Sequence, residues 1–284
     1  MQQQVETIAK LALSLANKYM APYGAVRSRK DFTQAQLMAC LVLRAYWKTT
    51  YRGLIENLNG QTQLRAILGM EDHLPHYTTV QKFSERSKVL EILNEMLQCL
   101  GKAAIRHEKS QVVAAMDSTG MEAGTASAHF VSRSGKERNR WVKVSVIVLG
   151  GSLLPLSANF DWGPSNDKTQ APKIIEPMLA GVKPDKLYAD AGYDAEWIHG
   201  LCRDHGVQTV IKPARCAADG SRSGENRSKM SDQYLKQQKY GQRWLVETYM
   251  SGLKRTTGSA LTARKPQNLL IEAAIRVFAY ALRR

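Results

Sequence analysis

The sequence predicts an α/β fold with an all-α N-terminal region. The first hundred residues place apolar side chains at helical spacing, whereas short apolar runs typical of strands begin only at residue 111. From there, three strands in succession are followed by alternating helices and strands, an order typical of a mixed sheet with helices on both faces. We therefore divide the chain into a helical region, residues 1–105, and a sheet-containing region, residues 106–284.

The helical region carries two helix start signals. Residues 33–36, TQAQ, have the pattern of a capping box, and helical spacing continues from there to Asn59-Gly60. Residues 78–81, TTVQ, predict a second helical segment that runs to Leu100. Residues 50–70 offer two short helices around Asn59-Gly60, which fits a helix-turn-helix unit that reads DNA. A role in packing or in forming a dimer explains this pattern equally well.

Short apolar runs predict five strands in the sheet region. These runs cover residues 111–119, two strands within 143–160, 186–190 and 208–212. The two strands within 143–160 meet at Gly150-Gly151, a hairpin signal. Pro155 cannot donate a backbone hydrogen bond, so the second of these strands should lie at a sheet edge. Helices are expected over 168–180, over 194–205 and at the C-terminal end, with a loop over 213–233.

The charge of the chain indicates a polyanionic partner. Its 284 residues include 40 Lys and Arg against 25 Asp and Glu, a net charge of +15. Residues 201–284 contain 16 basic and 6 acidic side chains, and residues 132–143 contain five basic and one acidic. Such a charge attracts nucleic acid. A solvated basic surface would have the same composition.

Other compositional features narrow the class of protein. No run of about 18 uncharged apolar residues exists, and the N-terminus lacks the pattern of a signal peptide, so we expect a soluble cytoplasmic protein. The cysteines form no C-x-x-C pair and have no zinc-ligand spacing, so we expect reduced thiols. They are Cys40, Cys99, Cys202 and Cys216.

Two aspartates follow apolar strands. Asp117 ends the run VVAAM, and Asp190 ends the run KLYA. If the two strands are neighbours, both carboxylates meet at one edge of the sheet, where ligand sites form in open α/β folds. Two close anions raise each other's pKa unless cations neutralise them, so a pair of divalent metal ions suits them. Oxygen ligands without Cys or His favour Mg²⁺ or Mn²⁺ over zinc.

A third acid lies in the segment YGQRWLVETYMSGLKR, residues 240–255, which predicts an amphipathic helix. At about 100° per residue, four polar side chains fall within a stripe of about 60° and would face one target. They are Tyr240, Arg243, Glu247 and Lys254. On an isolated helix these side chains would form an exposed ladder of ion pairs. The two strand-ending aspartates favour a functional site instead.

Three segments, AMDST, YADAGYD and YGQRWLVETYMSGLK, together resemble the bacterial insertion-sequence DDE transposases of the IS-four/IS-five group. The last helix of these enzymes carries the pattern Y-x2-R-x3-E-x6-K. This sequence matches the pattern at every position, with Tyr240, Arg243, Glu247 and Lys254. The resemblance covers roughly residues 105–284.

The resemblance implies a ribonuclease-H-like mixed five-stranded sheet in which the first and fourth strands are neighbours. It also implies that Asp117, Asp190 and Glu247 bind two Mg²⁺ or Mn²⁺ ions about 3.5–4 Å apart. The segment YADAGYD contains a second acid, Asp194, which is an alternative to Asp190. We favour Asp190 because it ends the apolar run, and we expect Asp194 to cap the next helix.

The implied function is transposition, with metal-dependent cleavage at insertion-sequence ends followed by strand transfer into target DNA. Arg243 and Lys254 would hold phosphates, while Tyr240 would contact a phosphate or sugar, or else anchor its helix. The partners would be terminal inverted repeats and target DNA, bound by a homodimer at the nucleoid in the cytoplasm. Two other functions stay open: a metal-dependent nuclease of the same fold, and an inactive transposon-derived DNA-binding protein.

Five further side chains near these motifs allow two interpretations each. Asp161 and Asp167 are expected to serve loops and helix caps, with support of the metal ions as the alternative. Trp141 and Trp162 would either stack on bases or belong to the core. Ser118 directly follows Asp117, and we expect it to support a turn or a neighbouring side chain rather than to act as a nucleophile.

Overall fold

The computed structural model describes residues 2–27, 29–86, 88–106, 111–123, 141–214 and 223–284. The chain divides into two compact units. The helical unit comprises Met1–Met96, Ala123–Ser134 and Leu253–Arg284, and the sheet unit comprises Leu97–Glu122 and Gly135–Gly252. Within the described ranges, no helix has the length and apolar character needed to cross a membrane.

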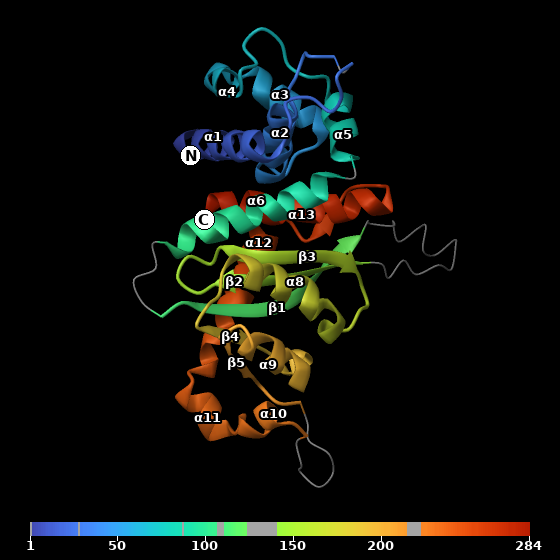
Figure 1. Cartoon of the computed structure of the whole chain (residues 1–284). Helices are drawn as coiled ribbons and strands as arrows, with labels where there is room; N and C mark the ends of the chain where they lie inside the picture. Colours follow the sequence, from blue (N-terminus) through green and yellow to red (C-terminus); the bar gives the residue numbers. More distant parts are fainter. Residues whose placement is uncertain (1, 28, 87, 107–110, 124–140, 215–222) are drawn as a thin grey trace, which may run out of the picture. The chain divides into compact units, whose positions relative to one another are not determined.

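Helices from both ends of the chain build the helical unit (Figure 1). They are α1 (Gln2–Tyr19), α2 (Gln34–Tyr46), α3 (Tyr51–Asn59), α4 (Thr62–Leu68), α5 (Tyr77–Ser84), the first part of α6 (Lys88–Ile105) and α13 (Pro266–Arg283). Helix α2 is buried over most of its length and contacts α1, α5 and α13. The C-terminal helix therefore completes a core that the N-terminal helices begin.

The two start signals of the helical region have different outcomes. The capping box is confirmed, since Thr33 Oγ1 accepts a hydrogen bond from Gln36 N at 3.2 Å and Gln36 Oε1 accepts one from Thr33 N at 2.7 Å. The single helix expected over residues 78–100 is wrong, because α5 ends at Ser84 and α6 begins at Lys88. The polar run ERSK between these helices interrupts the apolar spacing. Residues 50–70 form two short helices, as expected, in α3 and α4.

The sheet unit is built on a mixed sheet with the strand order β3-β2-β1-β4-β5. These strands are β1 (Val113–Ala123), β2 (Trp141–Leu149), β3 (Pro155–Trp162), β4 (Lys186–Ala189) and β5 (Gln208–Ile211). Strand β2 pairs antiparallel with β1 and β3, whereas β4 pairs in parallel with β1 and β5. A sixth strand, β6 (Ala260–Leu261), lies off this path, so the sheet has one strand more than expected.

The hairpin and edge predictions are confirmed. Strands β2 and β3 are joined by the turn at Gly150-Gly151, and Pro155 begins β3, which is the end strand of the path. Gly150 N donates a hydrogen bond of 2.7 Å to Val113 O. A Cβ at Gly150 would lie only 2.5 Å from Val113 Cγ2, so this close approach requires glycine.

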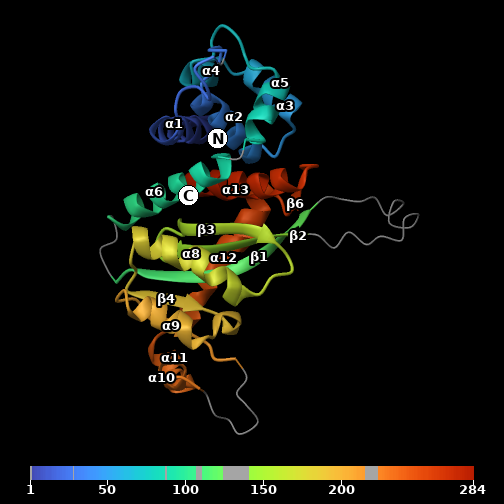
Figure 2. The same ribbon diagram turned by 45° about the vertical axis from the view of Figure 1, so that its right-hand side comes forward.

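Helices cover both faces of the sheet, as expected (Figure 2). Helices α8 (Asp167–Gly181) and α9 (Glu196–Arg203) and the 3₁₀ turn η1 (Ala191–Tyr193) lie on one face, where their apolar side chains share a buried core with the strands. The first part of α12 (Trp244–Thr257) lies on the other face. Val142 to Leu149 of β2 are buried without alternation, which is the pattern of a strand covered on both sides.

The expected loop over residues 213–233 contains more structure than its composition indicates. Its described part includes α10 (Glu225–Lys229) and the first residues of α11 (Asp232–Gln237). The N-terminus of α10 is capped from outside, because the Glu196 carboxylate accepts hydrogen bonds from the backbone N–H groups of Asn226 and Arg227 at 2.9 and 3.0 Å. A distant acid therefore stabilises this short helix.

Three sequence features extend beyond the described residues. They are the basic cluster at 132–143, of which 132–140 is not described, the loop at 213–233, of which 215–222 is not described, and Cys216. Cys40 and Cys202 are buried and form no disulfide.

Candidate active site

Asp117 and Asp190 lie on neighbouring strands. Strands β1 and β4 pair in parallel with Met116 opposite Ala189, and the two aspartates are the next residue of each segment. The expectation that these strands are neighbours is confirmed. Asp117 does not end β1, however, because antiparallel pairing with β2 carries the strand on to Ala123. Asp117 therefore lies where β1 loses its partner β4 but keeps its partner β2.

The turn after β4 leaves room for a third acid, Asp167, at the same edge of the sheet. Asp190 Oδ1 accepts a hydrogen bond from Gly192 N at 2.8 Å, which starts η1. A Cβ added at Gly192 would lie 3.0 Å from carboxylate oxygens of both Asp190 and Asp167. The missing side chain thus leaves room for these two carboxylates to approach each other.

Asp167 reaches this edge from the first turn of α8, whose N-cap is Asn166. Its Oδ1 lies 2.7 Å from Nζ of Lys143, a side chain on β2 with only 5% of its surface exposed. Lys143 also donates a hydrogen bond to the backbone oxygen of Ser165. Sequence reasoning gave Asp167 a loop or cap role first and did not consider Lys143. The useful signal was a lysine inside an otherwise apolar strand, which needs a buried acceptor.

The negative charge at this edge is incompletely balanced. Burial raises the pKa of Asp117 to about 6, and repulsion from Asp190 and Asp167 adds to the rise, while the Ser118 N–H and Arg243 oppose it. The nearest described cation is Arg243, whose Nη1 lies 3.7 Å from Asp117 Oδ2. An additional positive charge near Asp117 would therefore stabilise the charged form of its carboxylate.

A hydroxyl network fixes the two aspartate-bearing segments to each other. Ser118 Oγ lies 2.7 Å from the Tyr193 hydroxyl of η1 and 2.8 Å from Ser145 Oγ of β2. Tyr193 is fully buried, and burial raises the pKa of its phenol. These contacts place Ser118 in a supporting role beside Asp117, because its oxygen is already shared between two hydroxyl partners.

The segment with the third predicted acid is not one continuous α-helix. It begins with a 3₁₀ turn, η2 (Tyr240–Arg243), and α12 follows from Trp244. Lys239 has a left-handed backbone with φ of 56°, and its oxygen accepts a hydrogen bond from Gln242 N, which tightens the first turn. The Tyr188 hydroxyl of β4 donates to the Gln238 oxygen at 2.8 Å, so η2 is held beside the strand that leads to Asp190.

Glu247 is not brought together with the two aspartates. Its carboxylate forms an ion pair with Arg243, one turn earlier, and 53% of its side chain is exposed. Within the described part of the chain, no group of three or more acidic, histidine or cysteine side chains is arranged to hold a metal ion. Arg243 therefore lies between Asp117 and Glu247 and contacts both.

The sequence matches the family model described as the transposase DDE domain over residues 108–282, which is more than half of the chain. The chain belongs to this family of DDE transposases. It is therefore an enzyme of DNA transposition that cleaves DNA and transfers strands. The resemblance to DDE transposases is confirmed at this level.

Two further comparisons accompany this match. A search of curated proteins found no match. Among solved structures, the transposase is similar to one described as a cryo-EM structure of the piggyBac transposase synaptic complex with hairpin DNA. That similarity has 11% sequence identity and a TM-score of 0.45, and covers 99% of this chain and 72% of the other.

Two other side chains of the sequence pattern Y-x2-R-x3-E-x6-K flank Arg243 and Glu247. Tyr240 is partly buried, and burial raises the pKa of its phenol, while the neighbouring Arg243 lowers it. Lys254 lies in the last turn of α12, seven residues after Glu247, which puts the two side chains on one side of the helix.

Asp194, the alternative to Asp190, has a different set of partners. Its buried carboxylate accepts hydrogen bonds from Arg227 Nε at 2.9 Å, from Arg227 Nη2 at 2.8 Å and from Ala214 N at 2.9 Å. The expectation that Asp194 caps the next helix is wrong, because α9 has Ala195 as its N-cap and lacks a side-chain cap. Asp194 instead fastens the chain around Ala214 and Arg227 to the turn after β4.

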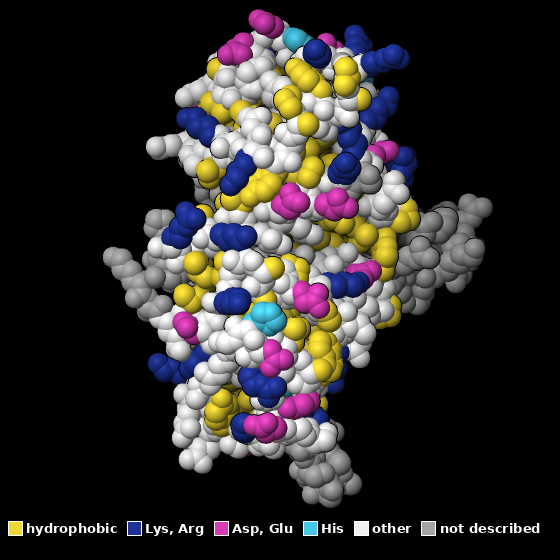
Figure 3. Space-filling model, viewed as in Figure 1, with side chains coloured by type: hydrophobic (Ala, Val, Ile, Leu, Met, Phe, Trp, Pro, Cys, Tyr) yellow, Lys and Arg dark blue, Asp and Glu magenta, His cyan; other side chains and the backbone are white. Residues whose placement is uncertain are grey.

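The tryptophans differ in exposure. The Trp141 ring packs against Gly120 and Gly163, where an added Cβ would lie 3.0 Å and 2.3 Å from ring atoms. Trp244, to which sequence reasoning gave no role, directly follows Arg243 and is 55% exposed. Figure 3 shows one face of the transposase, on which Lys and Arg side chains are interspersed with Asp and Glu. Net charge alone therefore does not locate a DNA-binding surface on this face.

Proposed function

We propose that this transposase cleaves DNA at the ends of an insertion sequence and joins those ends to target DNA, with Asp117, Asp190 and Glu247 as its metal-binding carboxylates. The observation that carries the proposal is the position of Asp117 and Asp190 at one register level of β1 and β4. The raised pKa of Asp117 supports it, since burial and then repulsion from Asp190 and Asp167 disfavour its charged form, which a bound cation would stabilise.

The donor atoms suit Mg²⁺ or Mn²⁺, and we propose two ions as the cofactor. Asp117 and Asp190 offer only carboxylate oxygens, the ligands that these hard cations prefer. Glu247 would join them by exchanging its ion pair with Arg243 for a metal ion. When bound, such ions activate a water or a 3′-hydroxyl and stabilise the leaving oxygen of a phosphodiester.

The basic side chains of the signature would then position the DNA. Once released from Glu247, the Arg243 guanidinium presents a fork of N–H donors that fits a phosphate. Lys254 would supply a second positive charge further along α12, and Tyr240 would donate its hydroxyl to a phosphate near the cut. The match of these residues to Y-x2-R-x3-E-x6-K supports membership of the IS-four/IS-five group.

We further propose that residues 106–284 carry catalysis and residues 1–105 bind DNA ends or form a dimer interface. The two short helices α3 and α4 support a DNA-reading role, since they have the lengths and the tight connection of a helix-turn-helix unit. On DNA, two copies of the transposase would pair, one for each end of the element, at the nucleoid.

The first test is a cleavage assay on labelled insertion-sequence ends with Mg²⁺. The variants Asp117→Asn, Asp190→Asn and Glu247→Gln should each lose about a thousandfold in rate, because each removes a ligand of ions that stabilise the transition state by several kcal/mol. Asp194→Asn should keep cleavage per folded molecule. Retained cleavage in Asp190→Asn together with loss in Asp194→Asn would reverse the assignment of the second aspartate.

The second test separates a transposase cycle from simple nuclease action. Precleaved ends are mixed with a target plasmid and Mg²⁺, and joined products are measured on a gel. Joined product that disappears in Asp117→Asn supports strand transfer by the proposed site. Cleavage without joined product would instead identify a metal-dependent nuclease, and joining that persists in Asp117→Asn would remove the proposed site.

A further inference from the structure

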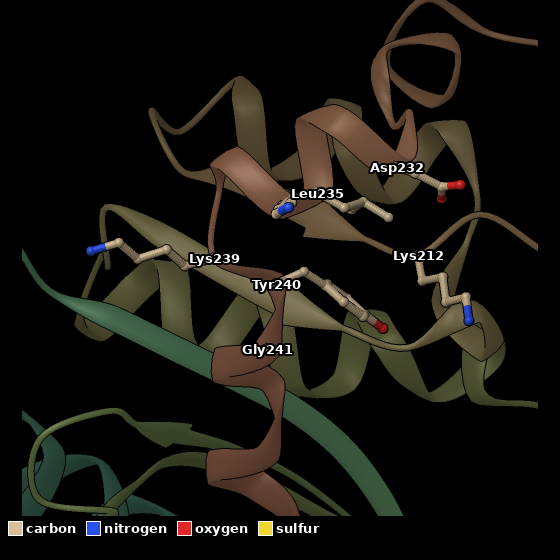
Figure 4. A pocket seen from close by; sticks show the side chains of 7 residues that line it. Lys212, Asp232, Leu235, Lys239, Tyr240 and Gly241 are labelled. Carbon is tan, nitrogen blue, oxygen red and sulfur yellow. The ribbon is translucent and has the colours of Figure 1, made fainter.

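Two places in the sheet unit gather charged side chains, with opposite net charge. One is a pocket of about 400 Å³ formed by the end of β5, helix α11 and η2 (Figure 4). Its charged lining consists of one acid, Asp232, and three lysines, Lys212, Lys236 and Lys239. The other is the edge of the sheet that Asp167 reaches, where the described acids outnumber the bases. A cation is therefore attracted to the edge at Asp167 and not to the pocket.

Asp167 uses one oxygen of its carboxylate to bind a buried lysine. Its Oδ1 lies 2.7 Å from Nζ of Lys143, and only 5% of that lysine side chain is exposed. Lys143 also donates a hydrogen bond to the backbone oxygen of Ser165. A buried ammonium group needs such acceptors. The pairing therefore fixes Oδ1 of Asp167 and balances one negative charge of the edge.

The other oxygen of Asp167 is directed at Asp190. A Cβ added at Gly192 would lie 3.0 Å from Asp167 Oδ2 and 3.0 Å from Asp190 Oδ1, so both oxygens approach the same point beside this glycine. Among the described residues, no hydrogen bond reaches Oδ2 of Asp167, and Asp190 has no ion-pair partner. Two negatively charged groups thus face each other without a cation between them.

The charge of Asp167 also acts on Asp117. Repulsion from Asp190 and Asp167 adds to the burial that raises the pKa of Asp117 to about 6. No three described acids converge on one point, so the approach of Asp167 to Asp190 is pairwise. A divalent cation beside the pair would replace this repulsion by attraction to both carboxylates.

From these contacts we infer that Asp167 is a fourth carboxylate of the proposed metal site, with Lys143 as its permanent counter-ion. Oδ2 of Asp167 would share a divalent cation with Asp190, while Oδ1 stays paired with Lys143. Carboxylate oxygens are the ligands that Mg²⁺ and Mn²⁺ prefer. The inference rests on the proposed function, since it adds a residue to the same site.

Asp161 provides a matched comparison, because its carboxylate lies nearby but is bound differently. On β3 it is the register partner of Lys143, yet it pairs with Lys173 of α8 at 2.7 Å. Its other oxygen accepts a hydrogen bond from Trp162 N at 2.8 Å. The side chains of Asp161 and Asp167 are about equally exposed, at 34% and 33%. Both oxygens of Asp161 are therefore occupied, whereas Asp167 has one available.

The test measures binding of Mn²⁺ to the full-length transposase by isothermal titration calorimetry in the absence of DNA. Asp167→Asn keeps the shape of the side chain and removes its charge. It should weaken Mn²⁺ binding about tenfold, as expected for a group that supports a metal site. Asp161→Asn should change the affinity by less than about twofold, because it removes one partner of an exposed ion pair. Equal affinity in the wild type and folded Asp167→Asn, or an equal loss in the two variants, would overturn the inference.

Lys143→Met gives a second readout that does not depend on the affinity of Asp167→Asn. It leaves Asp167 without its counter-ion, so this variant should melt at a lower temperature than the wild type in EDTA. Saturating Mn²⁺ should then raise the melting temperature by more degrees than in the wild type, because the ion takes over the charge of Asp167. In Lys143→Met/Asp167→Asn this excess should disappear. An equal rise in the wild type and Lys143→Met would show that Mn²⁺ does not reach Asp167.

Asp117→Asn separates failure of this inference from failure of the proposed function. Weaker Mn²⁺ binding in Asp117→Asn together with wild-type binding in Asp167→Asn would count against Asp167 alone. Wild-type binding in Asp117→Asn as well would count against the proposed metal site. Thermal melts in EDTA establish that each variant is folded, and if Asp167→Asn does not fold, the rise in Lys143→Met decides.

Discussion

The helical unit and the sheet unit differ in how completely their buried charged side chains are paired. In the helical unit, Glu272 and Arg276 of α13 form an ion pair of 2.7 Å with less than a tenth of either side chain exposed. Glu272 also accepts two backbone hydrogen bonds from the turn before α13, and Arg276 donates to the Gly258 oxygen. In the sheet unit, Asp117 has one arginine, Arg243, at 3.7 Å, and that arginine is also paired with Glu247.

This contrast shows which kind of buried charge indicates chemistry. A fully paired ion pair such as Glu272–Arg276 fastens a loop to a helix and leaves no group available for a ligand. Asp117 is repelled by Asp190 and Asp167 and shares its arginine with Glu247, which costs stability, and that cost is recovered when a further cation binds. Incomplete pairing of a buried carboxylate therefore distinguishes the proposed active-site edge of the sheet from the paired charges of the helical unit.

The largest effect is expected when the incompletely paired edge is changed. Asp117→Asn should slow DNA cleavage by about a thousandfold, because it removes one of the proposed metal ligands. In the presence of EDTA the same variant should melt at the same temperature as the wild type or higher, since it removes repulsion from Asp190 and Asp167. Cleavage rates test the expected loss of activity, and calorimetric melts test the expected melting temperature. A variant that is both inactive and strongly destabilised would show that Asp117 holds the fold.

The buried ion pair of the helical unit should respond in the opposite way: its disruption should lower stability and leave cleavage unchanged. Arg276→Met leaves Glu272 buried without its partner and should lower the free energy of unfolding by about 3–5 kcal/mol. The double variant Glu272→Gln/Arg276→Met should recover part of that loss, because no charge is then left buried. Urea denaturation measures both, and cleavage per folded molecule should be unchanged. Equal stability of Arg276→Met and wild type would contradict the contrast between the units.

The sheet was predictable from sequence because each strand is a short apolar run with clear ends. The position of Asp117 beside Asp190 followed from strand adjacency, and Pro155 identified the edge strand through its missing N–H group. These features depend on local composition and on simple rules of pairing. The strand end at Asp117 was wrong because the extent of β1 is set by its antiparallel partner β2.

Features that depend on contacts between distant residues could not be predicted. Asp167 comes to the carboxylates through the start of α8 and through Lys143, a buried residue 24 positions earlier in the chain. Helix α10 depends on a cap from Glu196. The 3₁₀ turn before α12 depends on the left-handed Lys239, a conformation that a lysine does not signal. Helical spacing alone therefore predicted one continuous helix over residues 240–255, whereas the segment begins with a 3₁₀ turn.

Asp194 is an acid of the sheet unit whose carboxylate is fully paired. Its replacement should therefore lower stability, as expected for Glu272, rather than slow cleavage, as expected for Asp117. Asp194→Asn should lower the free energy of unfolding by about 1.5–3 kcal/mol at pH 7, as expected for hydrogen bonds to a charged group. Although burial raises it, the contacts with Arg227 and Ala214 hold the pKa of Asp194 below its usual range. The stabilisation should be complete above the unfolded pKa of about 3.9 and disappear as pH falls through the lower folded value.

The control for Asp194 is Asp204→Asn, since Asp204 and Arg203 form an exposed pair of 3.4 Å. That variant should change stability by less than about 0.5 kcal/mol at any pH, because exposed pairs contribute little. Urea denaturation from pH 3 to pH 8 compares the two. If the loss in Asp194→Asn were the same at pH 3 and pH 7, the pairing with Arg227 would not be its cause.

The smallest effects are expected at two matched helix caps, one in each unit. Thr33 caps α2, and Asn166 caps α8 by accepting a hydrogen bond from Lys168 N at 2.9 Å. Replacing either by Ala should lower the free energy of unfolding by about 1 kcal/mol. Only Asn166→Ala should also slow cleavage, because Asp167 is the next residue and its carboxylate reaches the edge with Asp117 from that turn. Equal cleavage rates per folded molecule in the two variants would show that the start of α8 does not influence the site.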